Sequence, residues 1–204
     1  MMDLLQNFLF AVVFSFLGSI PPGTLNLTVI QLGMEKKMKI AWRFAIAAAL
    51  IEYPYAWIAV VFEGWITNSP VILNNFKLIS AVVLILLGGL NIWSSQRPTV
   101  FTKKFQESGF RRGVALSILN PLAMPFWIAI TAYLNVQGWI NLSTKGQLHS
   151  YLAGISIGAF ILLILAAYLS KKMVAAYQPG SKVKLIPGLV LLALGIYAFI
   201  EYLF

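Results

Sequence analysis

Apolar positions along the chain gather into six long stretches separated by shorter polar connections. By residue number the stretches are about 4–32, 41–62, 76–93, 113–134, 149–169 and 186–203. A helix needs about 20 apolar residues to cross a bilayer core of roughly 30 Å, and each stretch approaches or exceeds that length. The pattern therefore predicts an all-α integral membrane protein with six transmembrane helices, organised as one domain over residues 1–204.

Proline interrupts the first and the fourth stretch. The residues at the two breaks are Pro21, Pro22, Gly23, Thr24 and Asn26 in the first stretch, and Ser117, Asn120 and Pro121 in the fourth. Proline lacks an N–H and clashes with the preceding turn, so it frees backbone polar groups, and in hydrocarbon these groups need another partner. Breaks in matching helices of two halves are typical of a secondary-transporter site. We expect these residues to line a substrate or ion site, with Asn26 and Asn120 binding freed backbone groups; a packing kink is the alternative.

Two sets of three helices, residues about 1–93 and about 113–204, resemble a repeat. The pattern Val-Leu-x-x-Leu-Gly at Val83–Gly88 recurs at Val190–Gly195, 107 residues later. Because each set holds an odd number of spans, the second set inserts upside down relative to the first. The sequence therefore predicts inverted-topology halves, the arrangement from which alternating access is commonly built.

The second stretch carries a single acid, Glu52, near its middle. Tyr55 and several small residues share the helical face around it; the small ones are Ala45, Ala48, Ala49, Ala56 and Ala59. Small residues let helices approach closely, so this face is expected to contact protein. A carboxylate at mid-depth is costly unless it is paired, hydrated or protonated, and such acids mark ion pathways or substrate sites. We expect Glu52, with Tyr55 nearby, to bind a coupling ion or a substrate amine; a structural hydrogen bond is the alternative.

Composition excludes several classes of function. Hydrophobic residues make up 60% of the chain and charged residues 10%, whereas soluble domains are about half apolar. With no cysteine and one histidine, thiol–disulfide chemistry, iron–sulfur clusters and a histidine-rich metal site are excluded, and we expect no metal or other cofactor. No G-x-x-x-x-G-K-[ST] motif is present. Neither a Ser/His, a Cys/His nor a paired-carboxylate arrangement occurs within the spans, so no enzyme is predicted.

The basic residues predict the orientation in the membrane. The chain carries a net charge of +9, and 13 of its 15 Lys and Arg residues lie in or beside alternate connections. Only Lys77 and Lys145 lie on the other side. Cytoplasmic loops concentrate Lys and Arg, so connections 33–40, 94–112 and 170–185 are expected inside and both termini outside. This distribution makes the charge a topology signal, and no nucleic-acid partner is expected. No Lys or Arg precedes the first stretch, which predicts a retained helix instead of a cleaved signal peptide.

The spans, the two breaks and the buried acid together resemble the LysE/RhtB family of amino-acid exporters over nearly the whole chain. Family members typically carry Pro-Gly-Pro-Asn, an aspartate and Asn-Pro-Lys in the first, second and fourth helices. The corresponding residues here are Pro21-Pro22-Gly23-Thr24-Leu25-Asn26, Glu52 and Asn120-Pro121-Leu122. Leu122 thus replaces the family's lysine.

The resemblance implies a multi-pass protein of a bacterial-type inner membrane that exports an amino acid or related metabolite. Its partners would be that small molecule, a coupling ion and the lipid bilayer, and assembly into a homo-oligomer stays open. A metal-cation transporter of the same wider superfamily and a non-transporting membrane scaffold are the alternatives. Transport of a divalent metal is less favoured, because such metals need several oxygen or nitrogen ligands and Glu52 is the only carboxylate expected deep in the membrane.

Overall fold

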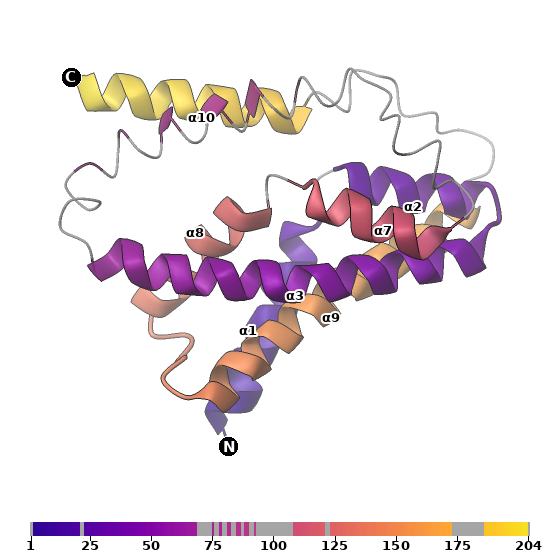
Figure 1. The fold of residues 1–204 in the computed structure, drawn as a ribbon, viewed down its shortest axis with the longest axis horizontal. Helices are drawn as coiled ribbons and strands as arrows, with labels where there is room; N and C mark the ends of the chain where they lie inside the picture. The colour runs from indigo at the N-terminus through magenta and orange to yellow at the C-terminus, as the bar shows by residue number, and fades with distance from the viewer. Residues whose placement is uncertain are drawn as a thin grey trace.

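The structure is a computed structural model that describes residues 2–20, 23–68, 108–120, 123–172 and 186–203, together with nine single residues between 75 and 92. The predicted third stretch therefore lies mostly outside the described residues, as does most of the motif at Val83–Gly88. Helices form the described part of the chain, without strands (Figure 1). Their bounds are α1 Met2–Gly18, α2 Thr24–Met34, α3 Met38–Asn68, α7 Gly109–Ile118, α8 Ala123–Val136, α9 Lys145–Lys172 and α10 Ile186–Leu203.

Within the described ranges, two helices are long and apolar enough to cross a membrane. They are α3, over the 28 residues Met38–Trp65, and α9, over the 27 residues Lys145–Lys171. The pair α7 and α8, bent by 66° at a short break, makes a third if it is counted as one span. The shorter apolar helices α1 and α2 occupy the predicted first stretch. The described part of the chain is thus all-helical, with apolar helices of membrane-spanning length, and the count of six spans stays a prediction.

Helix α9 packs along both halves of the first broken stretch, α1 and α2. Two glycines allow the approach to α1: a Cβ on Gly154 would lie 2.5 Å from the Phe8 carbonyl oxygen, and one on Gly158 2.5 Å from that of Val12. Contacts this short leave no room for a side chain. Ser15 joins the same two helices, because its hydroxyl donates a 2.6 Å hydrogen bond to the Ile155 carbonyl. The α1–α9 contact is therefore a backbone-to-backbone crossing of the kind that small residues permit.

Helix α3 packs in the same manner along α7 and α8, the two halves of the other broken stretch. A Cβ on Gly109 would lie 2.2 Å from the Ile40 carbonyl oxygen, and one on Gly113 2.6 Å from that of Phe44. The small face predicted for the second stretch is therefore in contact with protein, as the burial of Ala45, Ala48 and Ala56 also indicates.

Two apolar clusters fill the interior. One, here called the Phe44 cluster, contains residues Val29, Leu32, Ala41, Phe44, Ala45, Ala48, Leu116, Leu163 and Ala167. The other, here called the Trp127 cluster, contains residues Ala11, Ala56, Ala59, Trp127, Leu134, Ile140, Tyr151, Leu152 and Ile155. Along α3 the first cluster ends at Ala48 and the second begins at Ala56. Glu52 lies between these two positions of α3 and is hydrogen-bonded to Trp127 of the second cluster.

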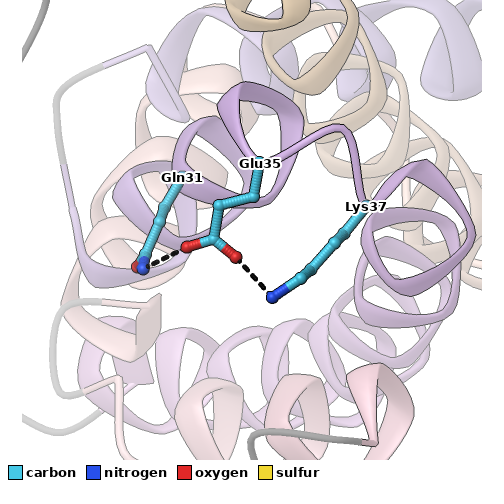
Figure 2. Close-up of polar contacts among 3 residues, drawn as sticks. All are labelled: Gln31, Glu35 and Lys37. Atoms are coloured by element: carbon cyan, nitrogen blue, oxygen red, sulfur yellow. Dashed lines mark hydrogen bonds and ion pairs between the residues drawn. The ribbon is translucent and has the colours of Figure 1, made fainter.

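The two ends of the bundle differ in their polar contacts. At one end, in the turn from α2 to α3, the Glu35 carboxylate accepts a 2.8 Å hydrogen bond from Gln31 and lies 2.8 Å from the Lys37 ammonium (Figure 2). The contact with Lys37 lowers the pKa of the Glu35 carboxyl most, and the hydrogen bond from Gln31 lowers it next. The charge of Arg112 on α7 adds to this effect. The turn itself requires a left-handed residue, Lys36, with φ of 58°.

The opposite end joins the start of α1 to the connection between α8 and α9. The Asn7 amide donates to the Asn141 carbonyl at 2.6 Å, and the Asn141 N–H donates back to the Asn7 oxygen at 3.1 Å. Gln147 donates to Asp3 at 3.1 Å. Asp3 and Lys145 lie at this end, whereas Glu35, Lys37 and Arg112 lie at the other.

Candidate functional site

The first break separates α1, which ends at Gly18, from α2, which begins at Thr24. Pro21 and Pro22 lie outside the described residues. The Asn26 side-chain amide donates a short hydrogen bond to the Ser19 carbonyl, a group that a continuous helix would satisfy internally. Gly23 precedes α2 in an extended conformation, without a side chain that caps the helix. Asn26, at 9% exposure, thus makes the backbone contact expected of it.

The second break separates α7, which ends at Ile118, from α8, which begins at Ala123. Pro121 and Leu122 are not among the described residues. The freed carbonyl here belongs to Ile118, and it accepts a 2.5 Å hydrogen bond from the Tyr55 hydroxyl of α3. The Asn120 N–H donates a 3.1 Å hydrogen bond to the Ser117 carbonyl. Tyr55, which was expected at a substrate or ion site together with Glu52, therefore binds the Ile118 carbonyl at this break.

Ser117 differs from its neighbours at the second break. Its side chain is 3% exposed, and its hydroxyl has no hydrogen-bond partner within the described part of the chain. A buried hydroxyl without a partner costs free energy that a bound polar group would recover. In this respect Ser117 resembles Arg112 and Ser156, which also carry a buried polar atom without a partner in the described residues.

The two breaks meet through the residues that flank them. A Cβ on Gly18, the last residue of α1, would lie 2.0 Å from the Cζ atom of the Phe126 ring. Phe126 lies in the first turn of α8. The end of the first half-helix of one broken stretch therefore contacts the beginning of the second half-helix of the other, and only glycine fits at position 18 with the ring in this place.

Glu52 of α3 contacts α8, the helix that follows the second break. Its carboxylate Oε1 accepts a 2.6 Å hydrogen bond from the indole N–H of Trp127, whose side chain is 1% exposed. Less than one helical turn along α3, Tyr55 binds Ile118 at the end of α7. One face of α3 thus binds both helices that flank the second break.

Trp127 is the site residue that sequence reasoning missed. A buried tryptophan needs an acceptor for its N–H, and Glu52 is the acid in the middle of a span, but no spacing along the chain connects positions 52 and 127. Glu52, Tyr55 and Ser117 gather at the second break, whereas Asn26, Gly23 and Thr24 belong to the first. Their roles toward a substrate remain a proposal.

Comparisons with known proteins give one result. Neither a curated protein nor a solved structure matches the chain. The sequence does match a family described as LysE type translocator over residues 16–202. That range includes both breaks and Glu52, and it covers most of the chain. With apolar helices, and a match over most of its length, this chain belongs to the LysE type translocator family, which is a family of membrane transporters.

Proposed function

We propose that this chain is a secondary transporter that exports amino acids or related small metabolites from the cytoplasm, driven by an ion gradient. Family membership supports transport of this general kind. The observation that carries the finer proposal is the position of Glu52, an acid between two apolar clusters and hydrogen-bonded to the helix that follows the second break. An intramembrane acid at a helix break is where an ion or a cationic group would exchange.

The helix pairing supports two inverted halves. An inverted repeat exchanges the first stretch with the fourth and the second with the fifth. The contacts of α9 with α1 and α2 are then equivalent to those of α3 with α7 and α8. The third and sixth stretches exchange with each other, and a Cβ on Gly195 of α10 would lie 2.8 Å from Ile85. In this proposal each half contributes its long helix to pack against the broken helix of the other, and alternating access would come from movement of one half against the other.

The polar groups at the breaks suggest how an amino acid is bound. Glu52 would bind the ammonium group, or the coupling proton when the substrate has left. The N-terminus of α2, with no side-chain cap at Gly23, would present its first N–H groups to the carboxylate, because helix N-termini favour anions. The Ser117 hydroxyl would bind a further polar group. In this arrangement backbone amides, together with Asn26 and Asn120, take the place of the cation that Leu122 replaces.

Orientation follows from the charge pattern. We propose an inner-membrane protein with both termini outside, which fits the gathering of Lys37 and Arg112 at one end of the bundle. Single cysteines can be introduced because the chain has none. In intact cells Ser95→Cys and Ser181→Cys should resist a membrane-impermeant thiol reagent, and Ser143→Cys should react. The reverse pattern would contradict both the orientation and export as the direction of transport.

Counterflow in proteoliposomes tests the function itself. Vesicles containing the purified chain are loaded with one unlabelled amino acid at a time and given a trace of the same labelled compound outside. At least one amino acid should accumulate its label, and Glu52→Gln should abolish the uptake driven by an imposed proton or sodium gradient. Trp57→Phe is the control, since Trp57 lies on the same helix but is 50% exposed. Counterflow of divalent cations with no amino-acid counterflow would favour the metal-transport alternative.

A further inference from the structure

Trp127 is held by packing on its ring and by one polar contact at its edge. The ring lies edge-on to Phe126, with centroids 4.9 Å apart, and edge-on to Tyr151 of α9 at 6.5 Å. Its N–H donates to Glu52 at 2.6 Å. An indole N–H donates only and takes up no proton, so Trp127 can respond to the state of Glu52 but cannot replace it.

The strength of this contact depends on what Glu52 carries. A hydrogen bond to a carboxylate is roughly twice as strong as one between neutral groups, and a low local dielectric strengthens it further. When Glu52 gains a proton or binds an ammonium group, the charge that Trp127 faces is neutralised or shared. The link between α3 and α8 then weakens, whereas the link from Tyr55 to Ile118 joins neutral groups and keeps its strength.

We propose that Trp127 is a positioning residue for Glu52, which orients the carboxylate when it is unoccupied and couples its occupancy to the position of α8. The identity of the proton or ammonium group at Glu52 rests on the proposed function. The coupling itself rests on geometry: one face of α3 holds α7 through Tyr55 and α8 through Glu52. Loss of charge at Glu52 would release one side of the second break while the other side stays held.

Other titratable groups near this pair come from α3 and α9. Tyr55 interacts electrostatically with Glu52. Tyr151 lies against the Trp127 ring, and its hydroxyl is within 3.0 Å of Thr131. His149 on α9 is hydrogen-bonded to Tyr53 of α3 at 2.6 Å. Glu63 of α3 also interacts electrostatically with Tyr151, so His149 and Glu63 are the side chains whose influence on Trp127 control variants must exclude.

Fluorine NMR of the full-length chain tests the coupling without transport. The six tryptophans are replaced biosynthetically by 5-fluorotryptophan, and the Trp127 resonance is assigned as the one lost in Trp127→Phe. That resonance should move as the pH is raised from acid to neutral in the parent, in His149→Gln and in Glu63→Gln, and should stay in place in Glu52→Gln. The same movement in Glu52→Gln, or none in the parent, would overturn the proposal.

Transport gives the second readout. Trp127→Phe keeps an aromatic ring between Phe126 and Tyr151 but removes the donor that favours the charged carboxylate. The pH profile of gradient-driven uptake should therefore move toward alkaline pH by about half a unit or more, while Trp57→Phe leaves it in place. Superimposable profiles for Trp127→Phe and the parent would overturn the coupling. If instead the NMR result holds and Glu52→Gln transports normally, the positioning role stands and the proposed transport role of Glu52 fails.

Discussion

The two helix breaks solve the same physical problem in different ways. At the first, the freed carbonyl of Ser19 is bound by Asn26, seven residues further along the same chain segment. At the second, the freed carbonyl of Ile118 is bound by Tyr55, which lies 63 residues away on α3. The Ser19 carbonyl is therefore satisfied within its own segment, whatever the rest of the bundle does. The Ile118 carbonyl keeps its partner only while α3 stays in place, and α3 is the helix that carries Glu52.

Under the proposed function, the two breaks would have different tasks. A locally satisfied break keeps its shape when neighbouring helices move, so α1 and α2 are suited to present a constant surface to a ligand. A break held by another helix changes when that helix moves or when its contacts weaken. The α7–α8 break, bound through Tyr55 and next to the Glu52–Trp127 pair, is therefore the place where a change at the acid would be converted into a change of helix angle.

The largest expected effect comes from removing the charge at Glu52. Glu52→Gln keeps the size of the side chain and an oxygen that accepts from Trp127, so the protein should insert and resist heat like the parent. Gradient-driven uptake into proteoliposomes should fall at least about tenfold, the equivalent of about 1.4 kcal/mol, because the amide cannot gain and lose a proton. Full uptake with an unchanged pH profile would show that the acid is structural and that recognition depends on the breaks alone.

The next largest effect concerns the contact that joins the two breaks. Gly18→Ala would place a methyl group 2.0 Å from a ring atom of Phe126, so the ring or the end of α1 must move. We expect a loss of about 1–3 kcal/mol in the free energy of unfolding, as is typical of overpacking, measured by denaturant titration in detergent. Gly64→Ala is the matched control, since a Cβ there meets nothing within 4 Å. Equal stability of the two variants would show that the breaks are not in contact.

Replacing the side chain that binds the freed carbonyl at each break tests whether the two breaks differ. Tyr55→Phe and Asn26→Ala should each cost about 1 kcal/mol of stability, the usual value of one hydrogen bond. In double-mutant cycles with Glu52→Gln, the Tyr55 change should be non-additive by about 0.5 kcal/mol or more, because both residues hold the same break from α3. The Asn26 change should be additive. Additivity for both would mean that the second break is as independent of Glu52 as the first.

The smallest effect on stability is expected at Ser117, although its effect on transport should be clear. Its buried hydroxyl has no hydrogen-bond partner among the residues that the structure describes. Ser117→Ala should therefore change the free energy of unfolding by less than about 0.5 kcal/mol, in either direction. If the hydroxyl contacts the substrate, the KM for transport should rise several-fold. An unchanged KM would show that the Ser117 hydroxyl does not contact the substrate.

Much of this architecture could be predicted from one-dimensional patterns. The length of the apolar runs predicts helices that cross a membrane, because the bilayer thickness sets a minimum length. Two breaks were expected from proline chemistry; α1 ends at Gly18 and α7 at Ile118, and the prolines that follow them lie outside the described residues. Asn26 was expected to bind a freed backbone group because it follows a predicted break. These properties depend on local geometry or on the solvent, so the order of residues carries them.

The contacts between helices were decided by the tertiary structure. Trp127 binds Glu52 only because α8 leaves the second break at an angle that brings position 127 against the middle of α3. Tyr55 reaches Ile118, and Phe126 reaches Gly18, for the same reason. A hydrophobic pattern indicates which face of a helix is buried but not its rotation and register against a partner. Those depend on how all the helices pack together, so the partner of the buried acid could be found only in three dimensions.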